Sequence, residues 1–350
     1  MSRPFIGARV GVVMGGWSGE HEVSICSGNA VAEALTSQGY DVVRIVIPQQ
    51  HSADASGASV LLDAIVRSGI DVAFIALHGR LGEDGCVQGM LELAAIPYTG
   101  AGVMASAIAM DKVKSKELFL LHNVPTPPYY TVSVHDDLAD VEGIHRHFGF
   151  PVIVKPRGEG SSIAVTRAGN LSELARGLQE VFDVDDYALV ERFVAGAEVN
   201  VGILNGRVLG AIEIVPNGGI YDYEAKYTPG ASVYHMPARL TPARYQNVLN
   251  LASRAVEALD ITGAARVDML VTAGENEYVL EVNTLPGMTE TSLLPKIAAA
   301  AGFEFAQLCD AILSAATLHA PQRRHNVRRS GTVMKPASVP VPALPLEATG

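Results

Sequence analysis

Two alternating stretches in the last third of the chain most constrain how it can fold. Residues 278–284 hold a carboxylate and an amide two positions apart, between apolar side chains, and a β-strand would place both polar groups on one face. Residues 265–271 repeat the alternation with an arginine and an aspartate. If the residues between them close a hairpin, the sequence predicts a cluster of three oxygen ligands with an arginine beside it: Asp268, Glu281 and Asn283, with Arg266.

These oxygen ligands indicate a site for a hard divalent cation. Mg²⁺ accepts carboxylate and amide oxygens and completes its octahedral coordination with water and substrate phosphates. The alternative is a surface hairpin whose charges are solvated. The other motifs of the chain help to decide between a cation site and a solvated hairpin.

Length and composition limit the classes of protein to which the chain can belong. At 350 residues it exceeds the size of a single growing hydrophobic core, so two or three domains are expected. No apolar run approaches the length of a membrane span, and the run at 10–14 is predicted to be a first strand and not a signal peptide. Three cysteines without close pairing argue against a disulfide framework and a cysteine-based zinc site, and favour a reducing cytoplasm.

Charge is distributed unevenly along the chain. The net charge of −11 disfavours nucleic acid and anionic membranes as partners. Residues 319–350, however, carry five basic side chains against one acidic side chain, together with five prolines. This segment is predicted to be a disordered tail after a domain that ends near Leu318. The tail can be a dispensable extension or a segment that binds a partner.

The first hundred residues alternate between apolar runs and helical stretches. This pattern is typical of an α/β layer around a mostly parallel sheet, in which functional loops follow the carboxyl ends of the strands. The predicted strands are residues 10–14, 42–47 and 71–77, and the predicted helices are 23–35 and 59–67.

Two loops at these strand ends carry chemically active side chains. Residues 15–22 combine glycines with Glu20, and residues 78–85 begin with His78. Glycines let the backbone approach a ligand, and a carboxylate that opens a helix can pair with a cationic ligand. The glycine spacing does not match the dinucleotide-binding fingerprint. Glu20 could alternatively compensate the charge of a helix N-terminus, and His78 could be a packed histidine at a strand end.

A lysine-bearing hairpin follows the first hundred residues. Residues 103–122 are predicted to form one helix, on which Lys112 can belong to a solvated face. After a strand at 129–132, a β-branched run ends at Lys155 and leads through glycines and serines to a strand at 163–166. Backbone N–H groups and hydroxyls of such a loop can cover phosphates, with Lys155 as a point charge. The Walker sequence is absent, so a nucleotide would lie between sheets; the alternative is an ordinary glycine hairpin.

Two further strand ends and one long loop complete the candidate site. Glu191 ends a predicted strand and Glu198 begins the next, where both could receive the amino and hydroxyl donors of a nucleoside. Residues 217–234 are rich in tyrosine, glycine and charge and show little periodicity. A long polar loop of this kind inside a domain is more often a lid than a connection.

Together these motifs resemble the D-alanine–D-alanine ligases of the ATP-grasp superfamily. The resemblance runs from about residue 10 to about residue 318, and all six motifs occur in order. They are EHEVS (20–24), LHG (77–79), KP with EGSS (155–162), YDYEAKY (221–227), RVD (266–268), and EVNT with PGMT (281–289). The resemblance implies an α/β domain with a parallel sheet, followed by a two-domain ATP-grasp fold of α+β type. The expected divisions are residues 1–100, 101–195 and 196–318, with a tail at 319–350.

The resemblance also implies the reaction and the residues that carry it. ATP would phosphorylate the carboxylate of a first D-alanine, and the amine of a second would attack the acyl phosphate. Glu20 would hold the first ammonium group, linked by hydrogen bonds to Ser161 and Tyr227, with His78 nearby. Arg266 and the backbone of Gly287 would stabilise the oxyanion. The second D-alanine would contact Ser292 and Leu293.

The cofactors implied by the resemblance are ATP and two Mg²⁺ ions, with Mn²⁺ as a possible substitute. The phosphates would bind three lysines, Lys112, Lys155 and Lys226. Glu191 and Glu198 would receive adenine and ribose, and the metal ligands would be Asp268, Glu281 and Asn283. A homodimer in the cytoplasm that serves peptidoglycan synthesis is the family expectation.

Family relatives that use D-lactate lack the Lys226-Tyr227 end of the lid, so its presence favours D-alanine as the acceptor. The alternatives are an ATP-grasp ligase that uses D-lactate or D-serine, or a non-catalytic nucleotide-binding protein on the same fold. Loss of Asp268, Glu281, Asn283 or Arg266 would favour the non-catalytic protein, and all four residues are present. The departures from the commonest family pattern are uncharged or peripheral: Trp17, Ala164, Ala265, Glu290 and Thr291.

Overall fold

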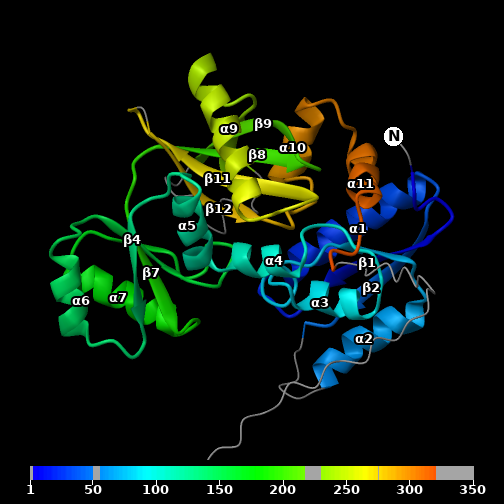
Figure 1. Cartoon of the computed structure of the whole chain (residues 1–350), viewed down its shortest axis with the longest axis horizontal. Coiled ribbons are helices and arrows are strands. Elements are labelled where there is room, and N and C mark those ends of the chain that lie inside the picture. Colours follow the sequence, from blue (N-terminus) through cyan, green and yellow to red (C-terminus); the bar gives the residue numbers. More distant parts are fainter. Residues whose placement is uncertain (1–2, 50–55, 217–229, 275, 321–350) are drawn as a thin grey trace, which may run out of the picture. The chain divides into compact units, whose positions relative to one another are not determined.

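The N-terminal part of the chain folds as a parallel sheet with helices packed against it (Figure 1). This computed structural model describes residues 3–49, 56–216, 230–274 and 276–320. The strand order is β2-β1-β3, and Tyr98 adds isolated bridges to Ala73 of β3 and to Thr317. The predicted α/β pattern is confirmed. Its elements are β1 (Arg9–Gly15), α1 (His21–Ser37), β2 (Asp41–Ile47), α2 (Ser56–Ser68), β3 (Val72–Ile75) and α3 (Cys86–Leu93).

A four-stranded antiparallel sheet follows, in the order β4-β7-β5-β6. The helix α7 is amphipathic: Leu174, Leu178 and Val181 recur at helical spacing and bury one face against the sheet. This sheet and its helices comprise β4 (Tyr129–Ser133), α6 (Leu138–His145), β5 (Val152–Pro156), β6 (Thr166–Ala168), α7 (Leu171–Phe182) and β7 (Tyr187–Arg192).

The third sheet is antiparallel, with the order β10-β9-β8-β11-β12. One face packs on α9 through Val248 and Ala252, and the opposite face meets α10 through Ile297. The predicted hairpin is confirmed as β11 and β12. The elements are β8 (Ala197–Leu204), β9 (Arg207–Pro216), β10 (Ser232–His235), α9 (Pro242–Ala258), β11 (Ala264–Val271), β12 (Glu277–Asn283), α10 (Leu293–Ala300) and α11 (Phe305–Ser314).

The strand β12 does not alternate as strictly as the sequence predicts. Asp268 lies opposite Glu281, whereas the next residue of β11 lies opposite Val279, so Leu280 is an extra residue in a β-bulge. Val279 and Val282 are both in the core, and Leu280 lines a cavity beside Glu281. Strict alternation would place Leu280 on the face of Val282, and the bulge turns it instead to the side of Glu281.

The single helix predicted for residues 103–122 is also wrong, because it breaks at Asp111. The chain forms α4 (Val103–Met110) and α5 (Lys112–Leu121), with Asp111 in an extended conformation between them. The Asp111 carboxylate accepts hydrogen bonds from the first turn of α5 and from the Arg157 guanidinium at 2.5 and 2.9 Å. Asp111 thus caps the N-terminus of α5 and forms a bidentate ion pair with Arg157, and these interactions stabilise the break between α4 and α5.

The loop after Lys155 is longer than predicted, because β6 begins only at Thr166. Ser161, Ser162 and Ala164 have positive φ angles of 49°, 59° and 51°. L-residues rarely adopt this left-handed conformation, and such strained residues cluster at functional sites. The predicted strand at 163–166 is therefore replaced by a strained turn.

The C-terminal helices return to the N-terminal sheet. Leu308 and Ile312 of α11 belong to the same core as Val10 and Val12 of β1. No single described helix is long and apolar enough to span a membrane; α10 and α11 reach the required length only as a pair, with a bend of 102° between them. Of the predicted lid at 217–234, residues 217–229 lie outside the described residues, whereas residues 232–234 belong to the strand β10 (Ser232–His235), so this end of the loop prediction is wrong. The predicted tail lies outside the described residues from residue 321 onward.

The Asp111 junction predicts a specific stability loss. Asp111→Ala removes both the cap of α5 and the pair with Arg157, and should lower the free energy of unfolding by about 2 kcal/mol. Asp111→Asn keeps a capping oxygen and should lose about half as much. Asp137→Ala is the matched control, because Asp137 caps α6 in an exposed position. Urea denaturation would measure all three; equal losses at Asp111 and Asp137 would contradict a role for the ion pair.

Candidate active site

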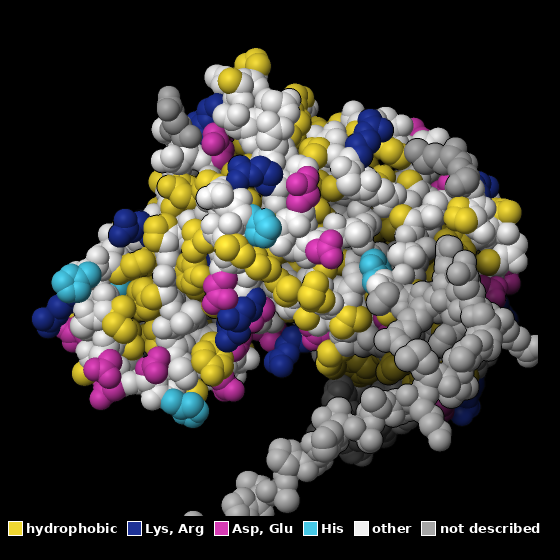
Figure 2. Space-filling view, in the orientation of Figure 1, with side chains coloured by type: hydrophobic (Ala, Val, Ile, Leu, Met, Phe, Trp, Pro, Cys, Tyr) yellow, Lys and Arg dark blue, Asp and Glu magenta, His cyan; other side chains and the backbone are white. Residues whose placement is uncertain are grey.

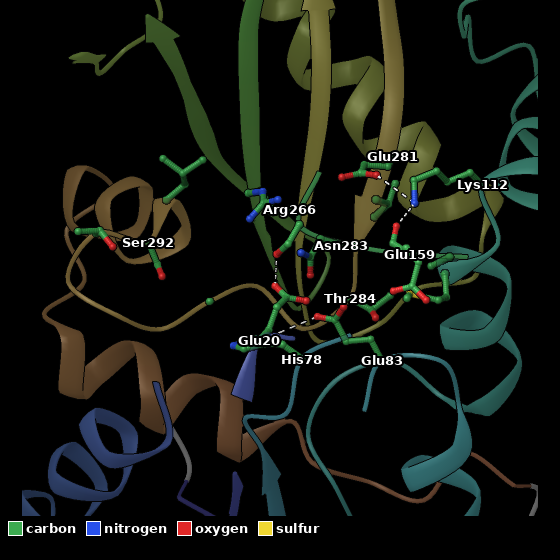
Figure 3. Close-up of a pocket in the computed structure, with 18 residues that line it drawn as sticks. Glu20, His78, Glu83, Lys112, Glu159, Arg266, Glu281, Asn283, Thr284 and Ser292 are labelled. Atoms are coloured by element: carbon green, nitrogen blue, oxygen red, sulfur yellow. Dashed lines mark hydrogen bonds and ion pairs between the residues drawn. The ribbon is translucent and has the colours of Figure 1, made fainter. Parts of the chain in front are cut away.

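Two cavities adjoin at the polar face of β11 and β12, and Figure 3 shows the residues that line the first of them. The first lies between the N-terminal loops and the hairpin, and is lined by Glu20, His78, Arg266 and Ser292, among others. The second lies between the two antiparallel sheets. Residues that line both cavities mark their junction: Lys112, Glu159, Gly160, Ser161 and Glu281.

Glu20 faces the first cavity and does not cap the helix that it precedes. It occupies the N-cap position of α1 but makes no capping hydrogen bond with its side chain. Its carboxylate instead accepts a hydrogen bond from the Ser161 hydroxyl, 141 residues away in sequence. This hydrogen bond links the first loop to the strained glycine-serine turn.

His78 forms a buried pair with a carboxylate that the sequence analysis did not select. Its Nδ1 lies 3.5 Å from Glu83 Oε1, and its Nε2 lies 3.4 Å from the Ser27 hydroxyl. Burial lowers the pKa of His78, but Glu83 and then Glu20 outweigh burial and raise it above its ordinary value. Burial also raises the pKa of Glu83. His78 and Glu83 therefore form one buried titratable pair at the wall of the first cavity.

The glycine-serine turn is fixed from two other elements. The Lys112 ammonium donates a hydrogen bond to the Glu159 carbonyl oxygen, and Arg80 lies 3.5 Å from the Glu159 carboxylate. Lys112 is 8% exposed, so it is not part of a solvated face. The ammonium group also lies 3.9 Å from Glu281. Lys112 therefore connects the turn to the hairpin at the junction of the cavities.

The wall of the second cavity holds three buried charges. Lys155 Nζ lies 2.6 Å from Glu191 Oε2, and the Lys116 ammonium pairs with the other oxygen of the same carboxylate. Burial raises the pKa of Glu191, but Lys116 and Lys155 outweigh it and hold the pKa below its usual value. Glu191 is thus an anion between two ammonium groups, and it lines the cavity as Glu198 does.

The hairpin brings its predicted polar residues together. Asp268 lies opposite Glu281, and Arg266 lies opposite Asn283. The Arg266 guanidinium donates hydrogen bonds of 2.7 and 2.8 Å to the two Asp268 oxygens. The predicted shared face of Arg266 and Asp268 is confirmed.

This donor set fits a hard cation. In the described part of the chain, no three His, Cys, Asp or Glu side chains form a metal-holding group, so a cation here would take two carboxylates and an amide from the protein and its other ligands from water or phosphate. Asn200 lies opposite Asp268 in β8, is fully buried, and has no hydrogen-bond partner for either amide atom. An orphaned amide beside the carboxylate row is consistent with a polar site.

The segment after β12 shapes the far side of the first cavity. The Ser292 hydroxyl accepts from the Thr289 N–H at 3.0 Å, and Ser292 is the N-cap of α10, with Leu293 buried behind it. A Cβ on Gly287 would come within 2.6 Å of the Ser292 hydroxyl, so only glycine fits there without a shift. The Met288 N–H donates to Ser27 at 3.2 Å and ties this segment to α1.

Most of the predicted site residues line the two cavities. Two of them, Lys226 and Tyr227, lie outside the described residues. Three residues were missed, although each lies near a predicted one. Glu83 belongs to the loop that starts with His78, Lys116 is one helical turn after Lys112, and Asn200 is two strand positions after Glu198.

Comparison with known proteins finds one family along most of the chain. A family model described as "D-ala D-ala ligase N-terminus" matches residues 9–59 and 53–101, and one described as "D-ala D-ala ligase C-terminus" matches residues 118–314. The D-alanine–D-alanine ligase of Syntrophotalea carbinolica is 47% identical over 314 residues, covering 89% of this chain and 96% of the relative.

Solved structures agree with this match. The D-alanine–D-alanine ligase of Bacillus anthracis complexed with ATP superposes with a TM-score of 0.75 at 35% identity, covering 88% of this chain and 97% of that one. The VanG D-Ala:D-Ser ligase of Enterococcus faecalis gives a TM-score of 0.75 at 29% identity, with coverages of 87% and 98%.

The His78–Glu83 pair predicts a measurable titration. Glu83→Gln removes the main group that raises the pKa of His78, so this pKa should fall. Because the pKa of His78 is higher in the folded than in the unfolded protein, protonation stabilises the fold at pH values below about 6.5. This stabilisation disappears as the pH rises through the pKa of the folded state. The variant should therefore be less stable than the native protein at low pH, and the difference should shrink as the pH rises. NMR titration of the His78 ring would measure the shift. Glu22→Gln, on the exposed first turn of α1, should leave the pKa of His78 unchanged.

Proposed function

Because the chain belongs to the D-alanine–D-alanine ligase family, its activity is the ATP-dependent joining of two D-alanines for peptidoglycan synthesis, and we propose how its two cavities divide the reaction. The fold is the family's ATP-grasp fold, with the N-terminal parallel sheet before it. In this proposal ATP occupies the cavity between the antiparallel sheets, and the amino acids occupy the cavity below the hairpin. Phosphoryl transfer takes place at the junction.

The first half-reaction forms an acyl phosphate. The carboxylate oxygen of the first D-alanine attacks the terminal phosphorus of ATP, and the bond to ADP breaks. Glu20, oriented by Ser161, holds the substrate ammonium group, with His78 beside it. Lys112 and Lys155 bind the phosphates. Two residues outside the described part of the chain are proposed to contribute as well: Lys226 to phosphate binding, and Tyr227 to the hydrogen bonds around Glu20. Glu191 and Glu198 hold adenine and ribose.

The second half-reaction forms the peptide bond. The amine of the second D-alanine attacks the acyl carbon, gives up a proton, and phosphate leaves from the tetrahedral intermediate. Arg266 and the Gly287 N–H are the preorganised donors for the developing oxyanion. Ser292 and Leu293 form the wall against the acceptor. The buried His78–Glu83 pair lies at the wall beside the first substrate.

The metal ligands are proposed to be Asp268, Glu281 and Asn283. Two Mg²⁺ ions, or Mn²⁺ in their place, would offset the negative charge of the phosphates when bound. The register of the hairpin places Asp268 opposite Glu281. Asp268 pairs with Arg266, and Glu281 lies beside Lys112.

One observation carries this assignment more than any other. Lys112, Ser161 and Glu281 line both cavities, and they come from α5, the strained turn and β12. A cation, a hydroxyl and a carboxylate therefore meet where a phosphate would pass from nucleotide to amino acid. Proximity of this kind is what phosphoryl transfer requires of a protein.

Phosphate release from Mg-ATP tests the function directly. It should require D-alanine, should not respond to L-alanine, and should yield the D-alanyl-D-alanine dipeptide. D-Serine and D-lactate belong in the assay as acceptors beside D-alanine, because the VanG relative is a D-Ala:D-Ser ligase. A preferred product with D-serine or D-lactate would reassign the acceptor, and ATP binding without turnover would support a non-catalytic role.

The hairpin carboxylate gives a sharper prediction. Glu281→Gln removes charge with little change in volume and should lower kcat by on the order of 100-fold or more. Glu277→Gln is the matched control, since Glu277 lies at the other end of β12 and pairs with Arg244 at 2.9 Å. The control loses the ion pair with Arg244 and should keep its kcat. Unchanged turnover in the Glu281 variant, with an intact fold by circular dichroism, would remove Glu281 from the mechanism.

We propose three domains, one for each sheet, with boundaries near residues 100 and 195. The proposed tail begins after His319, because the His319 N–H donates a hydrogen bond of 2.7 Å to Glu92; residues 321–350 lie outside the described residues. A cytoplasmic location is also proposed, and it is supported by three free cysteines, two of them exposed, which suit a reducing compartment. On the face shown in Figure 2, basic and acidic side chains of the described residues are interspersed, which agrees with small-molecule substrates and not nucleic acid.

We infer that the protein is a homodimer that pairs through α2 and α3. An apolar groove between these helices is lined by Leu62, Val66, Met90 and Leu93, among others. Leu93 is 92% exposed and Val66 is 62% exposed. Exposed apolar side chains that gather in this way mark protein interfaces, and a second copy of the chain is the family's expected occupant.

The dimer proposal predicts a change in mass. Light scattering should give about twice the chain mass of 36.9 kDa for the native protein, and Leu93→Glu should reduce it to one chain. Leu121→Glu is the control, because Leu121 is 73% exposed at the end of α5, outside the groove. A native mass of one chain, or equal effects of both substitutions, would reject this interface.

A further inference from the structure

Lys116 is a buried lysine that reaches the nucleotide cavity from behind its wall. The side chain has no exposed surface, and the residue lines neither of the two cavities. Its ammonium group pairs with Glu191 Oε1, donates a hydrogen bond to the Thr126 hydroxyl, and lies 5.4 Å from the centre of the Tyr129 ring. Burying an ammonium group is costly unless it is paired, so this position demands an explanation.

The partner of Lys116 is shared with a lysine that does face the cavity. Glu191 holds Lys116 on one oxygen and Lys155 on the other, with a Lys155 distance of 2.6 Å. Two positive charges and one negative charge leave this three-residue group with a net charge of +1. If Lys116 were absent, Lys155 and Glu191 would cancel each other, and the group would be neutral.

Lys116 retains its charge under ordinary conditions. Burial lowers the pKa of Lys116 to about 8, against the opposite effect of Glu191. The ammonium form therefore predominates at pH 7, while Glu191 is ionised. Lys116 thus acts as a cation and not as a neutral spacer.

We propose that Lys116 is a positioning residue for the nucleotide: it neutralises Glu191 from behind the wall and thereby leaves the charge of Lys155 available to phosphate groups. This inference rests on the proposed binding of phosphates at Lys155. Lys116 itself touches no substrate. Its effect is electrostatic: the positive charge of Lys116 offsets the repulsion that the Glu191 carboxylate would exert on a phosphate bound at Lys155.

The test compares phosphate binding in matched variants. Lys116→Met should weaken the binding of inorganic triphosphate, measured by calorimetry at a fixed Mg²⁺ concentration, by about tenfold or more. It should raise the KM for ATP by a similar factor, with a smaller effect on kcat. Lys114→Met is the control, because it removes the same charge from the same helix at an exposed site paired with Glu117. The control should bind triphosphate as the native protein does.

A second variant separates positioning from simple stabilisation. Lys116→Met combined with Glu191→Gln restores the net charge of +1 around Lys155 and leaves no unpaired buried carboxylate. Triphosphate affinity should return to within about threefold of the native value, although adenosine binding can remain weak because Glu191 is altered. The double variant tests the proposal even if Lys116→Met alone folds poorly.

Three results would overturn the proposal. They are native triphosphate affinity in Lys116→Met with only a lower melting temperature, equal losses in the Lys114 control, and a folded double variant that binds no better than Lys116→Met. Failure of the native enzyme to form the dipeptide would instead refute the assigned activity, because triphosphate binding is measured without amino acids.

Discussion

The pairing of β11 with β8 on one side and with β12 on the other is the constraint on which the site depends. Opposite residues of antiparallel strands share a face, so Asn200, Asp268 and Glu281 form one row across three strands. The other face carries the apolar residues that pack on α9. A slip of one residue would exchange these faces and place the carboxylates in the core, so the apolar packing also secures the position of the polar row.

The β-bulge in β12 refines this arrangement. It keeps Val279 and Val282 in the core and turns Leu280 and Glu281 toward the cavity between the antiparallel sheets. Glu281 can therefore line both cavities while its neighbour in register, Asp268, pairs with Arg266. Bulges commonly redirect side chains beside active sites, and this one places a carboxylate at the junction where the phosphoryl group is proposed to move.

The charged groups of the site are stable because they are paired with one another. Glu191 lies between two ammonium groups, and Lys112 contacts Glu281 and the turn at Glu159. Removing Glu191 would leave two buried ammonium groups without their carboxylate partner. Such a network contributes little net stability, because the desolvation of buried charges offsets their mutual attraction. Its placement between the sheets is explained by the binding of a polyanion, which is the role proposed here.

Local periodicity and side-chain type were enough to predict the three strands and first two helices of the N-terminal part, the β11–β12 hairpin and the residues with the required chemistry. The sequence also indicated the family, through motifs that occur in order. It did not reveal the break at Asp111, since the cap there is stabilised by an arginine 46 residues away. Nor did it reveal the bulge at Leu280, which depends on how β12 meets its neighbour.

Only the tertiary structure decided which charges are buried and with which partners they pair. Glu20 meets Ser161 across 141 residues, and Lys116 and Lys155 meet on one carboxylate. In the sequence Lys112 and Lys116 are equally compatible with a solvated helix face. Burial is a property of what packs against a helix, and that information lies in distant segments and not in the spacing of the lysines themselves.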